Sequence, residues 1–323
     1  MVTPEEIVRC LLTTFDKRAL TLFRSWLAQH PSITKWIIAS DFALRDPNRP
    51  ADCFAFTLIP YDALPQDIEA DITANLPKDI KKSKTINDAT IAWLRDPRRF
   101  HFAILMERNR AYYSTGPGSD QLNIARKSLQ RTLETIVRAE RDADQIRRLR
   151  KLVNKSQAKR FNVDLLTDLT FLAIWFPLIT LLLVREHRSN IVGWFSDRDK
   201  MTTWCDGIVW DFAREHLYDL GQVLGIDITD LLTPIATPEK TPNGEDMWFD
   251  DYIRPADWLA GALAAWNRVH NLVPGEQDKY VLTLREVVAD SPNIVLLPVY
   301  TDGSGIRCTR LMVSQTPITE PSI

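Results

Sequence analysis

WIIASD, at residues 36–41, is a run of four apolar residues that closes on a serine and a carboxylate. Short apolar runs with polar boundaries are typical of buried β-strands. Similar runs at 53–60 and 101–106 predict two further strands, and NIVGWFS at 190–196 predicts a fourth. The first run ends on an aspartate and the fourth is followed by one, so we expect acidic side chains at the ends of two strands.

The remaining segments alternate between helical spacing and turn-forming residues. Apolar residues three and four apart predict helices at 3–28, 120–160, about 200–220 and 254–269. Prolines break 64–94 into a short helix, a loop and another helix, and they make 225–251 a loop-rich segment. Two C-terminal strands are predicted at 294–300 and 307–313 around a turn at 302–305, and Pro298 restricts the first of them to a sheet edge.

The composition is that of a folded globular protein. The chain has 323 residues, of which 45% are hydrophobic and 25% charged, which excludes a disordered, collagen-like or coiled-coil protein. The four cysteines lie far apart and suggest neither a disulfide framework nor a structural zinc site. We therefore expect a cytoplasmic protein, and acids at Glu5, Glu6 and Asp16 argue against an N-terminal signal peptide.

One segment, 169–184, is apolar enough to suggest a membrane span. Fourteen of its sixteen residues are apolar. A helix of this length spans roughly 24 Å, at about 1.5 Å per residue, which is shorter than a hydrocarbon core of ~30 Å. We therefore expect a buried core helix, and a membrane partner is unlikely from the sequence.

The segment 126–160 is strongly basic. It holds twelve Lys and Arg residues and four acids, within a chain whose formal net charge is −2. Two interpretations are open: a solvated helix face, or a surface that follows a nucleic-acid phosphate backbone. The second interpretation assigns the nucleic-acid contacts to Arg147, Arg148, Arg150, Lys151 and Lys155.

Several familiar catalytic motifs are absent from the sequence, and carboxylates are the strongest remaining candidates. There is no phosphate-binding glycine loop, no His-Glu-x-x-His and no Gly-x-Ser-x-Gly, and the five histidines lack metal-ligand spacing. Acids do recur beside apolar runs: Asp41 ends the first, Asp197 and Asp199 follow the fourth, and Asp257 lies one turn into an apolar helix. Carboxylates gathered in this way suit Mg²⁺, and two such ions can hold an attacking water and a leaving oxygen in line.

Each acid also has a structural explanation. Asp41 can start a turn, and Asp257 can lie at an exposed helix start. Asp197 and Asp199 can cap the following helix or pair with a neighbouring cation.

RPADWLAGA, at residues 254–262, completes a longer pattern. The order of a strand ending in Asp, two further strands, basic helices, a strand followed by an acid, and this helix resembles the ribonuclease H-like superfamily. It is most similar to an uncharacterised branch with a last-helix Gln-x-Ala-Asp-x-hydrophobic-Ala-Gly motif, in which Arg254 replaces Gln. The resemblance covers about residues 33–270 and implies an α/β fold with a mixed sheet of five strands flanked by helices.

The resemblance also implies a metal site. In that superfamily, acids from the first strand, a later strand and the last helix surround one or two Mg²⁺ or Mn²⁺ ions. Asp41 is thereby implied as the first ligand and Asp257 as the last, while Asp197 is favoured as the middle ligand ahead of Asp199, with Asp211 behind both. A lysine cluster is implied near the substrate, with Lys84 on a phosphate; its members are Lys78, Lys81, Lys82 and Lys84.

These observations lead to one domain scheme and two functional hypotheses. We expect an N-terminal helical cover at 1–30, a ribonuclease H-like domain at 31–272 with a helical insertion at about 120–188, and a C-terminal β-hairpin extension at 273–323. The first hypothesis is a metal-dependent nuclease that uses Asp41, Asp197 and Asp257 to hydrolyse DNA or RNA. The alternative is a catalytically inactive scaffold that binds nucleic acid or a protein partner within a larger bacterial system.

Overall fold

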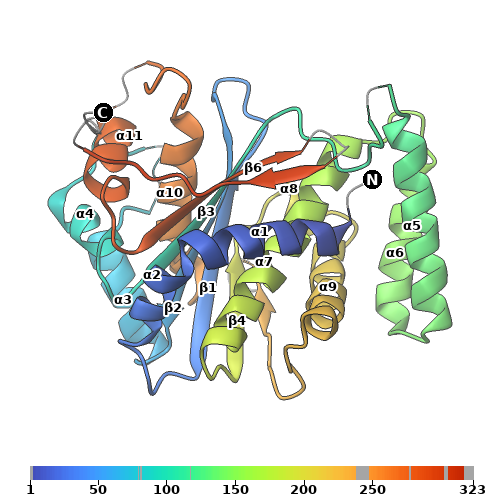
Figure 1. Cartoon of the computed structure of the whole chain (residues 1–323), viewed down its shortest axis with the longest axis horizontal. Helices are drawn as coiled ribbons and strands as arrows, with labels where there is room; N and C mark the ends of the chain where they lie inside the picture. The colour runs from blue at the N-terminus through green and yellow to red at the C-terminus, as the bar shows by residue number, and fades with distance from the viewer. Residues whose placement is uncertain are drawn as a thin grey trace, which may run out of the picture.

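The protein has an α/β fold built on a seven-stranded mixed sheet (Figure 1). The computed structural model describes residues 3–78, 80, 82–116, 118–237, 247–275, 278–301 and 305–315. The predicted α/β class is confirmed. In chain order the strands are β1 (Lys35–Ala43), β2 (Asp52–Pro60), β3 (Phe100–Met106), β4 (Ile191–Ser196), β5 (Ile235–Ala236), β6 (Ile294–Thr301) and β7 (Ile306–Cys308).

The order of the strands across the sheet is β5-β4-β1-β2-β3-β6-β7. β1, β2 and β3 form an antiparallel meander, whereas β4 runs parallel to β1 and β5 runs parallel to β4. On the other side, β6 runs parallel to β3 and β7 returns antiparallel to β6. The four strands expected first are therefore present, and β1 lies inside the sheet, between β4 and β2.

Helices cover both faces of the sheet and give the molecule two apolar cores. One core lies under α1 (Pro4–Arg18), α2 (Leu20–Leu27), α7 (Val163–Glu186) and α9 (Ile208–Leu224). The other lies under α3 (Pro65–Asn75), α4 (Asp88–Leu94), α10 (Arg254–Ala265) and α11 (Asp278–Leu282). The shorter helices are α8 (Lys200–Thr203), η1 (Asp250–Ile253) and the π-helical η2 (Thr283–Val288), and α5 (Gln121–Arg138) and α6 (Ala143–Ser156) form a hairpin at one end of the molecule.

The alternation of side chains along β1 decides which core each residue joins. Trp36 and Ile38 belong to the core beneath α7, whereas Ile37 and Ala39 belong to the core beneath α10. Because successive strand residues point to opposite faces, Asp41 lies on the same face as Ile37 and Ala39. The strand register therefore directs this carboxylate towards α10.

Three helices predicted as continuous are broken in the structure. The segment 3–28 bends at Ala19, and 120–160 forms two helices because a turn follows α5, with Glu140 in the left-handed region at φ 51° and Asp142 capping α6. Gly207, at φ 79°, separates α8 from α9. The helix predicted to reach 269 ends at Ala265, where the backbone of the next residue becomes extended. Periodicity alone missed these breaks, because the apolar spacing continues across each of them.

The apolar segment near the middle of the chain lies inside α7, a 24-residue helix. This helix is long and apolar enough to cross a membrane, and 94% of its most apolar 18-residue window is buried within the fold. Trp175 and its neighbours contact the sheet, so the predicted buried core helix is confirmed.

The C-terminal strands differ from the prediction in their positions. β6 does not lie at an edge, because β7 pairs with it at residues 299–301. Pro298 lies opposite Leu105 of β3 and cannot donate a hydrogen bond to a neighbouring strand, but its carbonyl accepts one from the backbone N–H of Thr309 at 3.1 Å. β7 is shorter than the predicted 307–313, and the turn predicted at 302–305 lies outside the described residues except for Gly305.

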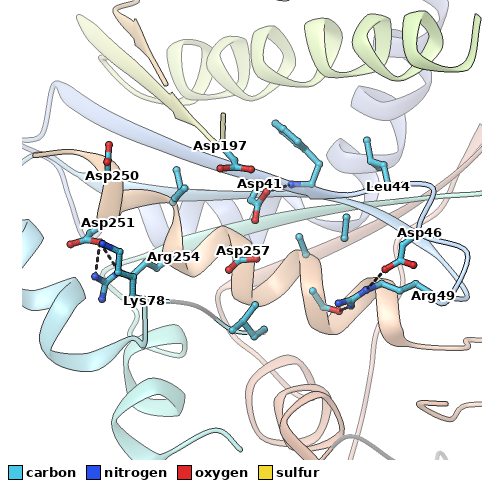
Figure 2. Close-up of a pocket in the computed structure, with 16 residues that line it drawn as sticks. Asp41, Leu44, Asp46, Arg49, Lys78, Asp197, Asp250, Asp251, Arg254 and Asp257 are labelled. Carbon is cyan, nitrogen blue, oxygen red and sulfur yellow. Dashed lines mark hydrogen bonds and ion pairs between the residues drawn. The ribbon is translucent and has the colours of Figure 1, made fainter. Parts of the chain in front are cut away.

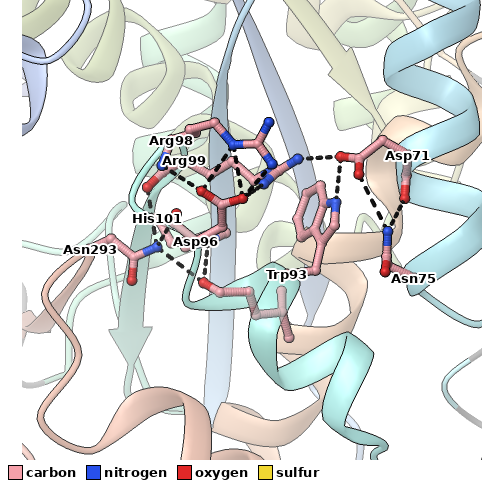
Figure 3. A network of polar contacts seen from close by, with 9 residues as sticks. Asp71, Asn75, Trp93, Asp96, Arg98, Arg99, His101 and Asn293 are labelled. Carbon is pink, nitrogen blue, oxygen red and sulfur yellow. Dashed lines mark hydrogen bonds and ion pairs between the residues drawn. The ribbon is translucent and has the colours of Figure 1, made fainter.

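A polar network joins α3, α4 and the start of β3 (Figure 3). Arg99 bonds both Asp71 and Asp96, and its guanidinium lies 3.9 Å from the centre of the Trp93 ring. The amide of Asn293 donates to three backbone carbonyls of the turn that precedes β3, each at 3.1 Å. The network therefore ties α3 and α4 to the start of β3 and to Asn293, just before β6.

A second network carries buried charge between β2 and α7. Asp52, Arg110 and Asp168 are all buried, and Arg110 bonds both carboxylates, with its Nε 2.8 Å from Asp168 Oδ1. Arg45 adds a second cation, with its Nε 2.6 Å from Asp168 Oδ2 and its backbone N–H donating to Asp52. Each buried charge here is matched by an opposite one, as buried ions require.

We predict that Arg110→Met destabilises the protein by about 3–5 kcal/mol, because the buried Asp52 loses the guanidinium that bonds it and Asp168 keeps Arg45 alone from this network. Urea unfolding, followed by circular dichroism, measures this change. Arg9→Met is the control, since Arg9 and Glu5 form an exposed pair that we expect to contribute under about 1 kcal/mol. Equal losses in the two variants would show that the buried network does not stabilise the fold.

Candidate functional site

The pairing of β1 with β4 brings two predicted site residues together. Ser40 is paired with Ser196 in this parallel register, and the backbone N–H of Asp197 donates to the carbonyl of Ser40 at 3.0 Å. Asp41 and Asp197 therefore follow equivalent positions on adjacent strands. Side chains at equivalent positions of parallel strands point to the same face, so both carboxylates lie on the side of α10.

The third predicted residue comes from α10, which packs across β1 and β2 on that face. Pro255 occupies the first turn, where its missing N–H costs nothing, and Ala256 and Leu259 are buried against the sheet. Asp257 lies in the same first turn and lines a cavity with Ala260 and Gly261. These small residues leave open space beside the carboxylate.

The cavity has a volume of about 500 Å³ and is rich in charge (Figure 2). Figure 2 shows the side chain of Asp41 between those of Asp197 and Asp257. Three further acids line the cavity: one lies on the loop after β1 and two lie on η1. The charged lining residues are Asp41, Asp46, Asp197, Asp250, Asp251 and Asp257, with Arg49, Lys78 and Arg254.

Asp41 is the electrostatic centre of the cavity. It is 8% exposed, and its burial raises its pKa well above the usual range of a carboxyl group. The nearby charges of Asp257 and Asp197 raise this pKa further, as does a hydrogen bond between the Asp41 and Asp257 carboxyl groups. The backbone N–H of Phe42 donates to Asp41 Oδ1 at 2.6 Å and opposes the shift. Burial and the neighbouring carboxylates therefore disfavour the ionised form of Asp41, and an approaching cation would favour it.

The carboxylates form a close pair with a third neighbour rather than a closed triad. Among the described residues, no three His, Cys, Asp or Glu side chains lie close enough to enclose a metal ion. Mg²⁺ seldom uses an all-protein cage; one or two carboxylates hold it while it keeps several waters. The hydrogen-bonded pair of Asp41 and Asp257 fits that requirement, and Asp197 is near enough to raise the pKa of Asp41.

Two of the cations that line the cavity are tied into its walls. Arg254 Nε donates to Asp251 at 2.8 Å, and its Nη1 donates to the carbonyl of Leu76 at 2.7 Å. Arg49 donates to the carbonyl of Gly261 and to the hydroxyl of Tyr280, the latter at 2.9 Å. Both guanidinium groups therefore connect loops to α10 and its neighbours.

Two other predicted acids lie outside the cavity. Asp199 caps α8, because its Oδ1 accepts from the backbone N–H groups of Met201 and Thr202 at 2.8 and 2.9 Å. Asp211 lies on α9 and is bound by Arg148 through two hydrogen bonds of 2.6 and 2.9 Å. The structural explanation weighed for Asp199 therefore accounts for its position.

The predicted nucleic-acid residues divide into paired and exposed groups. Arg147 and Lys151 form ion pairs with Asp206, and Arg148 pairs with Asp211, so these three connect α6 to α9. Arg150 and Lys155 are exposed on α6. Lys84 is exposed in the loop before α4. None of the six lines the cavity.

From the lysine cluster, the residue that does line the cavity is Lys78. Lys82 is exposed and does not line the cavity, and Lys81 lies outside the described residues. The lysine cluster therefore approaches the cavity at its first member rather than at Lys84.

Sequence reasoning missed several lining residues. Asp250 and Asp251 reach the cavity from η1. The sequence feature that could have indicated them is a pair of acids just before α10. Asp46 and Arg49 reach it from the loop between β1 and β2, where the sequence resembles an ordinary polar turn. No spacing rule links that turn to α10, because the contact depends on tertiary packing.

Comparisons of the chain with protein-family models, with curated proteins and with solved structures gave no match. The geometry of the cavity is therefore the basis for its interpretation.

We predict that Asp41→Asn raises the melting temperature at pH 7 without divalent cations, by about 2 °C or more. A raised pKa in the folded state means that the folded protein binds the proton more tightly than the unfolded chain does. This contribution is complete below the unfolded value, about 3.9, and is lost as pH rises through the folded value. The advantage of the variant should therefore shrink as the pH falls from 7 towards about 5.

Calorimetric scans in EDTA across this pH range measure the effect. Asp46→Asn is the matched control, since Asp46 lines the same cavity but hydrogen bonding to the backbone N–H of Asn48 lowers its pKa. A lower melting temperature for Asp41→Asn than for the wild type at pH 7 would assign the Asp41 carboxylate to structure.

Proposed function

We propose that this chain is a ribonuclease H-like, metal-dependent nuclease that hydrolyses phosphodiester bonds of DNA or RNA. The observation that carries the proposal is the meeting of three carboxylates, Asp41, Asp197 and Asp257, at one cavity. They come from β1, from the end of its parallel neighbour β4, and from α10, which packs across β1 and β2. These are the three elements from which the family resemblance implies the metal ligands.

The arrangement of the strands supports the ribonuclease H-like part of the proposal. An antiparallel meander of β1, β2 and β3 is extended on the β1 side by two parallel strands, β4 and β5. This is a mixed core of five strands, to which β6 and β7 add an extension. Function does not follow from a fold, so the assignment depends on the carboxylates.

The donor set fits a hard divalent cation. Asp41 and Asp257 would hold Mg²⁺ or Mn²⁺ through carboxylate oxygens, and Asp197 would complete the site from β4. When bound, such an ion supplies positive charge to the phosphodiester and activates water. Because a cation binds the ionised carboxylate and the pKa of Asp41 is raised, we expect cation affinity to increase with pH.

The charge of the cavity explains why a phosphodiester would need that cation. Six acids and three cations line the space, and two of the cations are engaged by Asp251, by backbone carbonyls and by Tyr280. A phosphate that entered alone would meet a negative field. A bound cation reverses the sign of the field where the phosphate would lie.

A second function, a nucleic-acid or protein-binding scaffold without catalysis, is favoured by one observation. Among the described residues the carboxylates do not form a three-ligand group, and burial and the neighbouring carboxylates raise the pKa of Asp41. Metal dependence separates the two functions, since the scaffold requires no cation at Asp41.

We predict that Mn²⁺ binds the wild type in a calorimetric titration, and that Asp41→Asn/Asp257→Asn abolishes this binding. Incubation with labelled single- and double-stranded DNA and RNA should then show hydrolysis by the wild type alone, with the double variant slower by at least about a hundredfold. Asp199→Asn is the matched control, because it removes an acid near β4 that caps α8 and does not line the cavity.

The outcomes of this experiment are distinct. Mn²⁺ binding without hydrolysis of any of the four substrates would contradict the nuclease. Failure of a folded wild type to bind Mn²⁺ would contradict both the metal site and the nuclease, and would favour the scaffold.

A further inference from the structure

We propose that the hairpin of α5 and α6 is a separate docking arm for a nucleic-acid phosphate backbone. We call residues 121–160 the basic arm. The inference that the arm binds nucleic acid depends on its own surface. The added inference, that the nuclease substrate is a polymer spanning from the arm to the cavity, rests on the proposed function.

The outer face of α5 carries cations that the fold does not use. The buried face of this helix consists of Ala125, Leu129 and Ile136. Lys127, Arg131 and Arg138 each follow one of these buried positions by two residues, which is about 200° around the helix, so they lie on the opposite face. All three are exposed, and none forms an ion pair with a described residue.

Two further cations extend this surface onto α6. Arg150 and Lys155 are exposed and form no ion pair among the described residues. Their neighbours differ, because Arg147 and Lys151 pair with Asp206, just before α9, and Arg148 pairs with Asp211 in the first turn of α9. The arm therefore holds some cations that attach it to the fold and others that remain available to a partner.

The chemistry of the arm favours a phosphate backbone over a lipid surface. A helix that lies on a membrane inserts an apolar face beside its cations. The apolar faces of α5 and α6 are already buried in the protein core, and Val137 is the one large apolar side chain that either helix leaves exposed among the described residues. A surface with charge and almost no apolar area suits contacts to phosphates, whose affinity comes from released counterions.

The position of the arm sets the size of the ligand. Figure 1 places α5 and α6 at one end of the longest axis of the molecule, whereas α10 lies towards the other end. No residue of the arm lines the cavity. A mononucleotide held at Asp41 therefore cannot contact the arm, but a long strand can contact both.

The test compares two triple variants that change the net charge equally. Lys127→Glu/Arg131→Glu/Arg138→Glu reverses the outer face of α5, and Lys17→Glu/Lys35→Glu/Arg188→Glu reverses three exposed cations elsewhere. Binding is measured in EDTA by fluorescence anisotropy with labelled DNA and RNA of about 40 nucleotides, single- and double-stranded, over a salt series. The arm variant should bind about tenfold more weakly at low salt, with a salt slope smaller by about two to three, and the control should match the wild type.

Three results would overturn the docking arm. One is equal binding by the arm variant and the wild type, and another is equal weakening by both triple variants. The third is an arm variant that no longer binds phosphatidylserine vesicles, which the wild type binds, while its nucleic-acid binding is unchanged. That result would assign the arm to a lipid surface. Lys127→Gln/Arg131→Gln/Arg138→Gln repeats the measurement with a milder change, should charge reversal prevent folding.

Hydrolysis separates the arm from the nuclease proposal. With substrates of about 5 and about 40 nucleotides, the arm variant should raise the KM for the long substrate and leave that for the short one unchanged. Equal effects on both lengths would overturn the polymer inference. Loss of binding by the arm variant, together with a wild type that hydrolyses nothing, would refute the nuclease and leave the arm intact.

Discussion

The parallel pairing of β1 with β4 is the constraint on which the candidate site depends. It aligns Ser40 with Ser196, so that Asp41 and Asp197 emerge beside one another on the face covered by α10. A shift of either strand by one residue would turn its carboxylate into the core beneath α7. The alternation that buries Ile37 and Ala39 therefore also positions Asp41, and the stability of the sheet fixes the geometry of the cavity.

Buried carboxylates are paired with cations on one face of the sheet and lie beside other carboxylates on the other face. Towards α7, Arg110 forms ion pairs with Asp52 and Asp168, and this attraction offsets the desolvation cost of burying the charges. Towards α10, Asp41 is buried beside two further carboxylates and shares a hydrogen bond with one of them, Asp257. Uncompensated carboxylates destabilise a fold, and such groups cluster at functional sites. Because of this contrast within one structure, we propose a functional role for Asp41 and a stabilising role for Arg110.

The sequence predicted the parts of this arrangement that depend on local pattern. Apolar runs predicted the first four strands in chain order, β1 to β4. Asp41 and Asp197 were identified because a polar residue marks the end of an apolar run. The breaks near Glu140 and Gly207 were not predicted, since they depend on left-handed turns within an uninterrupted apolar spacing. The ion pairs of Arg147, Arg148 and Lys151 with Asp206 and Asp211 were not predicted either, because these acids are distant in sequence. Burial, pairing and cavity shape arise from tertiary packing and could be read only from the fold.

The most direct test of the account is diffraction from crystals grown with Mn²⁺ near neutral pH, measured for its anomalous signal. We expect an anomalous peak between the carboxylates of Asp41 and Asp257, with Asp197 turned towards it. We also expect two carboxylate contacts to the ion in place of the hydrogen bond between Asp41 and Asp257. An ordered cavity without a peak, or a peak bound only by other residues, would contradict the central claim.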